Sequence, residues 1–234
     1  MAVHGRRYTS DISHRPIREE EIVESLRRIN EKGRGDILLI YMLLLASGVR
    51  YMHILDALKN WREDEYVYVD KLKSTIKRLE CKEEVCRYYL GKKNTVKPAG
   101  FMYFPRILLP LIRHYAGKMP SRRWITKQVK KWGCLPPKYI RTYALRLMER
   151  LFGETDKYKF IVSRFSELSI DAKRYWYLVE RVDEEYKKYI EIWLELINKA
   201  LPYPGDYFTL VLKNNNTDTK PNNKNHHNGL RNEA

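Results

Sequence analysis

The longest apolar run in the chain, Ile37 to Ala46, limits its possible folds more than any other feature. The run is too short to cross a bilayer as a helix, which takes about 20 apolar residues. A helix that is apolar on every side is stable only when other elements surround it. The run therefore predicts a central, buried helix over about Asp36–Ser47. Gly48 follows it, and glycine often ends a helix because it adopts the left-handed conformation easily.

Apolar residues at three- and four-residue spacing predict a helix before this one, from Arg18 to Ile29, and a short one just after Arg50. The period then changes to that of strands. Strands are expected at 66–69, 85–90 and 101–104, and the last two flank the turn-rich stretch GKKNTVKPAG, which predicts a hairpin with a long basic loop. The remaining chain predicts helices at 106–116, 121–132, 137–152, 157–165, 168–178 and 183–200.

This order of elements predicts an α+β fold that is mostly helical and has a small antiparallel sheet. No repeat and no alternation of strands and helices is present. We expect a flexible basic lead-in over residues 1–16, one folded domain over 17–200, and a polar, disordered tail over 201–234.

The charge of the chain indicates a polyanionic partner. It contains 45 Lys and Arg against 29 Asp and Glu, for a formal net charge of +16. The basic residues are spread along the chain, so the folded domain itself should carry the positive surface. Nucleic acid is the commonest partner of such a surface.

Several classes of protein are disfavoured by what the sequence lacks. It has no transmembrane run, and its first residues, MAVHGRRYTS, have no apolar signal-peptide core. Three cysteines, an odd count without a secretion signal, favour an intracellular protein with no required disulfide. No histidine lies at ligand spacing near Cys81 and Cys86, so we expect no metal site.

Two groups of cations are candidates for phosphate binding. Arg50 follows the buried helix in Ser-Gly-Val-Arg, where its guanidinium would be well held and can bind phosphate oxygens in pairs. Lys92, Lys93 and Lys97 lie on the predicted hairpin loop, from which a lysine can contact a phosphate or protonate a leaving oxygen. Taken alone, each group is more often a solvated surface feature.

Two further candidates lie in the C-terminal half. Lys138 and Arg141 begin a helix in Lys-Tyr-Ile-Arg and share one of its faces, close to the free amides of the helix start. Tyr175 is one of 18 tyrosines, and by itself it is most simply a packed aromatic residue.

In this order, the four candidates resemble the tyrosine recombinase family. Its pattern is an Arg in a Thr/Ser-Gly-x-Arg box, a hairpin Lys, a His/Lys-x-x-Arg box, a His/Trp position and a nucleophilic Tyr. The match is closest to archaeal virus integrases of the fusellovirus type, which have Lys in the second box, as at Lys138, and a basic residue in the His/Trp position, here Arg164. The resemblance covers about residues 16–198 and includes the segment 183–189, DEEYKKY.

The resemblance implies the catalytic domain of that family, with a three-stranded antiparallel sheet. It implies that Arg50 and Arg141 clamp the non-bridging oxygens of the scissile phosphate, that Lys93 or Lys97 protonates the leaving 5′-oxygen, and that Lys138 and Arg164 bind the phosphate or assist proton transfer. Tyr175 would attack and form a 3′-phosphotyrosyl linkage without metal or cofactor. Lys92, Lys97 and Arg174 would bind DNA.

The implied partner is a double-stranded DNA attachment site, bound by a homodimer to homotetramer in the cytoplasm of the host of a virus or mobile element. No membrane contact is expected. Tyr177 is the nearest rival nucleophile, but residues 175 and 177 point to different sides of a helix. We favour Tyr175 because Arg174 precedes it and Trp176 follows it, as the family pattern requires.

Two departures from the family leave other functions open. The family commonly has Glu or Asp three residues after the first Arg, where this chain has His53. The family also usually carries an N-terminal arm and a core-binding domain, whereas about 16 residues precede the first predicted helix here. The sequence is therefore either a fragment or a stand-alone catalytic domain. The alternatives are a catalytically impaired or regulatory DNA-binding fragment, and a basic helical scaffold for RNA or a protein.

Overall fold

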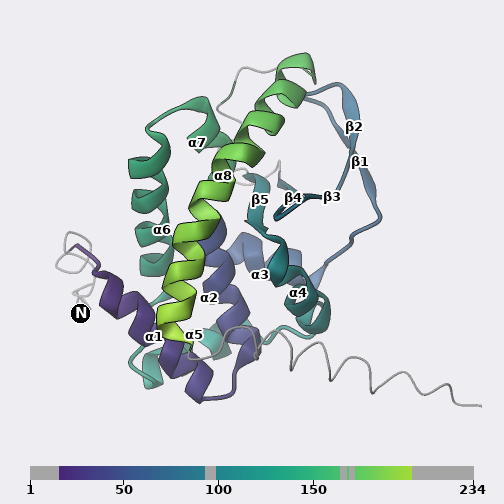
Figure 1. The fold of residues 1–234 in the computed structure, drawn as a ribbon. Helices are drawn as coiled ribbons and strands as arrows, with labels where there is room; N and C mark the ends of the chain where they lie inside the picture. The colour runs from purple at the N-terminus through teal and green to yellow at the C-terminus, as the bar shows by residue number, and fades with distance from the viewer. Residues whose placement is uncertain (1–15, 93–98, 164–167, 169–171, 202–234) are drawn as a thin grey trace, which may run out of the picture.

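The computed structural model describes residues 16–92, 99–163, 168 and 172–201, which form one helical body around a small sheet (Figure 1). Most of the predicted lead-in and tail lies outside these residues. The helices are α1 (Glu19–Glu31), α2 (Gly35–Ser47), α3 (Tyr51–Lys59), α4 (Leu109–Tyr115, after a 3-10 turn at Arg106–Leu108), α5 (Arg122–Lys131), α6 (Pro137–Phe152), α7 (Asp156–Ile161) and α8 (Ala172–Ala200). The strands are β1 (Tyr66–Val69), β2 (Ser74–Lys77), β3 (Leu79–Lys82), β4 (Val85–Lys92) and β5 (Ala99–Pro105).

Helix α2 is the centre of the core, as its apolar run predicts. All its residues are buried, and α1, α4, α6, α8 and β5 all contact it. The mostly helical α+β fold is therefore confirmed, and so is the end of α2 at Gly48, which adopts the left-handed conformation at φ 59°.

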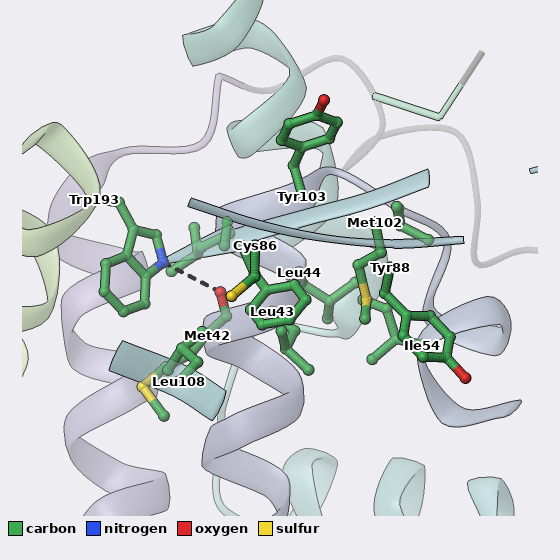
Figure 2. Packing of buried hydrophobic residues seen from close by; sticks show 14 of the residues in the cluster. Met42, Leu43, Leu44, Ile54, Cys86, Tyr88, Met102, Tyr103, Leu108 and Trp193 are labelled. Atoms are coloured by element: carbon green, nitrogen blue, oxygen red, sulfur yellow. Dashed lines mark hydrogen bonds between the residues drawn. The ribbon is translucent and has the colours of Figure 1, made fainter. Parts of the chain in front are cut away.

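Helix α8 runs antiparallel to α2 and is bonded to its backbone. The last carbonyls of a helix have no partner within it, and in a buried helix other groups must satisfy them. Tyr186 and Tyr189 of α8 do so for the carbonyls of Ala46 and Leu45. Trp193 adds a bond to the Met42 carbonyl, one turn earlier in α2 (Figure 2). The bonds are Trp193 Nε1 to Met42 O at 3.1 Å, Tyr189 Oη to Leu45 O at 2.5 Å and Tyr186 Oη to Ala46 O at 2.7 Å.

The main sheet is antiparallel with strand order β3-β4-β5, and helices cover both of its faces. Figure 2 shows Cys86, Tyr88 and Met102 on the face toward α2, while Tyr103 points away from it. The opposite face carries Phe101 and Tyr103, which contact aromatic residues of α7 and α8. The predicted hairpin is confirmed, with longer strands, but its tip at 93–98 lies outside the described residues.

The strand predicted at 66–69 is present but lies outside this sheet. That strand, β1, pairs with β2 in a separate two-stranded hairpin. Neither β2 nor β3 was predicted, because polar side chains interrupt the alternation of apolar and polar residues in both. Their backbone hydrogen bonds are made only with the strands that pair with them.

The expectation of no disulfide is also corrected. Cys81 and Cys86 are direct partners in the β3–β4 register, with Cα atoms 4.1 Å apart, and they form a disulfide. The count of cysteines does not reveal this, because the pair depends on where the strands turn. Cys134 is free and buried.

Three predicted helix limits also change. The helices expected at 168–178 and 183–200 form one continuous helix, α8, because buried Val179, Val182 and Asp183 carry its inner face through the expected break. The helix expected at 157–165 ends at Ile161. Among the described residues, no helix is both long and apolar enough to cross a membrane.

Candidate active site

The junction of α2 and α3 is tightly packed against α6. A Cβ atom added at Gly48 would lie 2.8 Å from Leu145 Cδ2 of α6, so glycine is required both by the backbone angle and by this close approach. Arg50 follows two residues later as the N-cap residue of α3, and it is half-buried. The sequence motif therefore lies at a point that three helices share.

Arg141 of α6 reaches the same junction. Its Nε donates to the Gly48 carbonyl at 2.7 Å, and Arg141 lies one helical turn before Leu145. The structure thus brings Arg50 and Arg141 to one helix junction, and their joint contact with a phosphate stays a prediction. Lys138, at the start of α6, is exposed, with its Nζ 5.7 Å from the centre of the Tyr139 ring.

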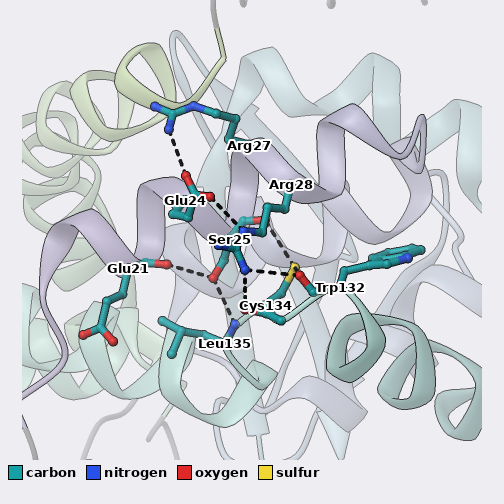
Figure 3. Close-up of polar contacts among 9 residues, drawn as sticks. Glu21, Glu24, Ser25, Arg27, Arg28, Trp132, Cys134 and Leu135 are labelled. Carbon is teal, nitrogen blue, oxygen red and sulfur yellow. Dashed lines mark hydrogen bonds and ion pairs between the residues drawn. The ribbon is translucent and has the colours of Figure 1, made fainter.

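The start of α6 is held by contacts with α1. The Leu135 amide donates to Ser25 Oγ at 2.9 Å, and Arg28 Nη1 donates to the Trp132 carbonyl at 3.3 Å (Figure 3). Ser25 is buried, so the connection between α5 and α6 is anchored on the core. This anchoring fixes where Lys138 and Arg141 emerge.

The sequence analysis missed a basic surface on α5. Ser121 caps this helix, which contains no acidic residue, and its cations are exposed. Burial raises the pKa of Tyr51 to about 12, and Arg122 opposes that shift. The start of α5 therefore lies near Tyr51, the residue that follows Arg50. Charge counted along the helix would have found this surface. The exposed cations are Arg122, Arg123, Lys127, Lys130 and Lys131.

Tyr175 lies at the start of α8 and exposes none of its side chain. Its ring centre is 5.9 Å from those of Phe101 on β5 and Phe160 on α7. Tyr177 is 61% exposed, so the two tyrosines do lie on different sides of the helix. Burial raises the pKa of Tyr175, and Arg87 opposes that shift.

A buried ionic cluster adjoins Tyr175, and the sequence analysis missed it. Arg87 on β4 bonds to Glu80 on β3 and to Asp183 on α8, the latter at 2.5 Å. Arg87 and Asp183 are both buried. Neither residue belongs to a motif, and their pairing depends on the strand register and on the path of α8.

The β1–β2 hairpin supplies two further lysines near a strand turn. Lys73 lies in the turn with φ 47° and is exposed, whereas Lys71 is half-buried and burial lowers its pKa. A lysine with a lowered pKa is a better proton donor near neutral pH. The sequence analysis considered only the second hairpin as a source of lysines.

The other predicted residues are placed as follows. Arg174 is exposed and pairs with Asp156 at 3.0 Å. Lys92 ends β4, and its side chain is not among those described. Lys93, Lys97 and Arg164 lie outside the described residues.

Tyr175 is separated from the arginine junction along the axis of α8. Tyr186 contacts the end of α2, and Tyr175 comes eleven residues earlier on the same helix, about 16 Å along its axis.

Among the residues that the structure describes, no three His, Cys, Asp or Glu side chains cluster as metal ligands would.

The mostly helical fold with a small antiparallel sheet is the one expected for a DNA integrase domain. The sequence model of the archaeal phage integrase family matches residues 15–192, which is most of the chain. The protein therefore belongs to the archaeal phage integrase family. No match was found among curated proteins. Membership in this family makes DNA its partner and site-specific integration its activity.

Proposed function

We propose that this integrase domain cleaves and rejoins DNA through a covalent bond between Tyr175 and the 3′-phosphate. The observation that carries the proposal is the arginine junction. Gly48 lets α6 approach so closely that Arg141 bonds to its carbonyl, two residues before Arg50. The Arg141 guanidinium and the backbone of Arg50 thus meet at one packed junction, from which both side chains would clamp a phosphate.

The chemistry follows from the charge that builds during attack. The Tyr175 oxygen forms a bond to phosphorus while the bond from phosphorus to the 5′-oxygen breaks. The attacking hydroxyl loses its proton to water, with Lys138 or Arg164 assisting the transfer, and the leaving oxygen gains one from a lysine. Arg50 and Arg141 stabilise the negative charge on the non-bridging oxygens, where losing one such contact costs about 3–4 kcal/mol. No metal is needed for these steps, so EDTA should not change the yield.

The burial of Tyr175 adds a requirement to this reaction. Its side chain has no exposed surface, so the first turns of α8 have to move before its hydroxyl can reach DNA. The basic face of α5 is a suitable surface for DNA, because every exposed cation there can neutralise a phosphate. Lys138 and Arg164 would complete the phosphate site.

The proton donor is assigned to a hairpin lysine. Lys93 and Lys97 remain the candidates from the family pattern, with Lys92, Lys97 and Arg174 as DNA contacts. Lys71 is a further candidate, because burial already lowers its pKa. A substrate with sulfur in place of the 5′-oxygen tests Lys71, Lys93 and Lys97 as donors, because a thiolate leaves without a proton. The lysine whose alanine variant recovers activity on that substrate is the donor.

The test of the nucleophile is a covalent trap. The full chain is incubated with a pooled library of random-sequence nicked duplexes that carry a bridging 5′-phosphorothiolate, and protein–DNA adducts are isolated in SDS and sequenced. The wild type and Tyr177→Phe should form adducts on the recovered sequence, whereas Tyr175→Phe should not. An adduct with Tyr175→Phe would exclude Tyr175 as the nucleophile.

A DNA-binding, non-cleaving fragment is the second candidate, and the complete burial of Tyr175 favours it. Such a protein would bind the library with strong salt dependence and form no adduct with any sequence. The same experiment therefore separates the two functions. Sedimentation of the DNA complex would show whether a dimer or a tetramer assembles, as the family pattern implies.

A further inference from the structure

We propose that Arg87 is a positioning residue for Tyr175: its ion pairs with Glu80 and Asp183 fix α8 against the sheet and so determine where Tyr175 lies. This inference rests on the proposed role of Tyr175 as the nucleophile. Arg87 itself lies in the central strand of the sheet and would act through α8 rather than touch DNA.

The geometry of Arg87 is that of a structural anchor. Its side chain is only 9% exposed, and that of Asp183 is only 3% exposed. Arg87 Nη1 lies 2.5 Å from Asp183 Oδ2, and its Nε donates to Glu80 Oε2 at 2.9 Å. Its two sides thus join α8 to β3 through β4. Such pairs seldom raise stability above that of an apolar replacement, so fixing one arrangement is the better account of this one.

Tyr175 shares the sheet face on which Arg87 lies. Arg87 is the register partner of Tyr103, and Tyr89 is that of Phe101, so these side chains point to one side of the sheet. Tyr175 packs on Phe101 from that side. Asp183 follows Tyr175 by eight residues, about two turns, and both side chains lie on the buried side of α8. The ion pair therefore sets both the rotation of α8 and its position along the sheet.

Arg87 also marks where the anchored part of α8 begins. From Asp183 onward the helix is bonded to the core through Arg87 and then through Tyr186, whose hydroxyl donates to α2. Before Asp183, the described side-chain ties include the exposed pair of Arg174 with Asp156 and the aromatic packing of Tyr175.

Titratable groups from every strand of the main sheet lie near Tyr175. Burial is the main cause that raises its pKa, Arg87 on β4 lowers it, and Glu80 on β3 and Asp183 on α8 raise it further. On β5, burial raises the pKa of Tyr103, and α7 contributes the apolar Phe160. Removing Arg87 and removing Asp183 should therefore move the Tyr175 pKa in opposite directions, although both changes break the same ion pair.

The experiment compares four variants of the full chain: Arg87→Lys, Arg87→Met, Asp183→Asn and the control Lys187→Met. Lys187 also joins α8 to the β3–β4 region, through Glu83 at 2.5 Å, but at the surface. Single-turnover adduct formation is measured on the recovered phosphorothiolate duplex. We expect Arg87→Met to slow it by about 100-fold, as small displacements of reacting groups do, with partial recovery in Arg87→Lys. Lys187→Met should react like the wild type.

A second readout does not depend on catalysis. 3-Fluorotyrosine at position 175 lowers the phenol pKa, and its fluorine resonance reports the titration of that residue alone. The midpoint should rise in Arg87→Met and fall in Asp183→Asn. If neither midpoint moves, or both move in one direction, Arg87 and Asp183 do not act beside Tyr175 as the inference requires, and the inference is overturned.

The two proposals fail in different ways. An adduct that persists in Tyr175→Phe refutes the nucleophile, whatever the fluorine titration shows. Loss of the adduct in Tyr175→Phe together with a wild-type rate in Arg87→Met refutes the positioning role alone. If Arg87→Met does not fold, Arg87→Lys and Asp183→Asn, which keep the side-chain size, decide: wild-type rates and midpoints in both refute the inference.

Discussion

Replacing Gly48 with alanine tests the packing that holds the two arginines together. Gly48 has φ 59°, where a residue with a Cβ costs about 1–2 kcal/mol. The new Cβ would also lie 2.8 Å from Leu145 Cδ2, and overpacking of this kind costs about 1–3 kcal/mol more. Because Leu145 is half-buried and its end can shift, we expect a total loss of about 2–4 kcal/mol in the free energy of unfolding.

Gly33→Ala is the matched control. Gly33 has nearly the same backbone angle, φ 61°, but nothing lies within 4 Å of its added Cβ. It should lose only the backbone contribution of about 1–2 kcal/mol. Urea unfolding followed by circular dichroism measures both variants, and the difference between them isolates the contact with α6. The melting temperature should fall by about 2–4 °C for each kcal/mol lost in a chain of this size.

A double variant sharpens the comparison. If the contact of the new Cβ with Leu145 causes the extra loss of stability in Gly48→Ala, shortening Leu145 to alanine should remove that contact. The double variant should then lose less stability than the sum of the losses in the two single variants. The same packing positions Arg141, and we expect Gly48→Ala to reduce adduct formation at a temperature at which it is fully folded. Equal losses in Gly48→Ala and Gly33→Ala, with additive effects of Leu145→Ala, would refute the reasoning.

Three other changes have expected outcomes. Tyr186→Phe removes a buried hydroxyl that donates to α2 and leaves its acceptor unpaired, so it should cost about 1–3 kcal/mol in urea unfolding, while Tyr177→Phe, at the surface, should cost almost nothing. Reducing the Cys81–Cys86 disulfide opens a short loop and should lower stability by about 2 kcal/mol; a melting temperature that dithiothreitol leaves unchanged would count against this. Arg113 holds the pKa of the Glu63 carboxyl below its ordinary value. This pair therefore stabilises the fold at pH above the unfolded-state pKa of Glu63, and its contribution is lost as the pH falls through the lower folded-state pKa. In Glu63→Gln, the free energy of unfolding should fall less steeply as the pH is lowered.

The parts of the fold that the sequence predicts are those with a strong local signal. The buried helix α2 and its end at Gly48 follow from an uninterrupted apolar run and one glycine. The β4–β5 hairpin follows from two apolar strands around a turn-rich stretch. In each case, the residues that decide the structure are neighbours in the chain.

The parts that it does not predict depend on partners far apart in the chain. The short strands β2 and β3 exist because other strands pair with them. Whether Cys81 meets Cys86 depends on that register.

The candidate site shows the same division. The family pattern predicts that Arg50 and Arg141 act together, and the Gly48 contact of Arg141 is consistent with it. The pattern contains no sign of Arg87, because its partner Asp183 lies 96 residues away. It also gives no sign that Tyr175 is fully buried, which depends on the packing of Phe101 and Phe160 around it. The nucleophilic role of Tyr175 stays a prediction.

The bonds from α8 to the end of α2 have a consequence for how the protein is made. The carbonyl of Ala46 receives its partner from a residue 140 positions later, and that of Leu45 from one 144 positions later. During synthesis, the carbonyls at the end of α2 therefore have no hydrogen-bond partner from α8 until α8 has been made. Long-range contacts of this kind slow folding and expose apolar surface while the chain is incomplete. We expect the newly made N-terminal half to depend on chaperones until α8 has left the ribosome.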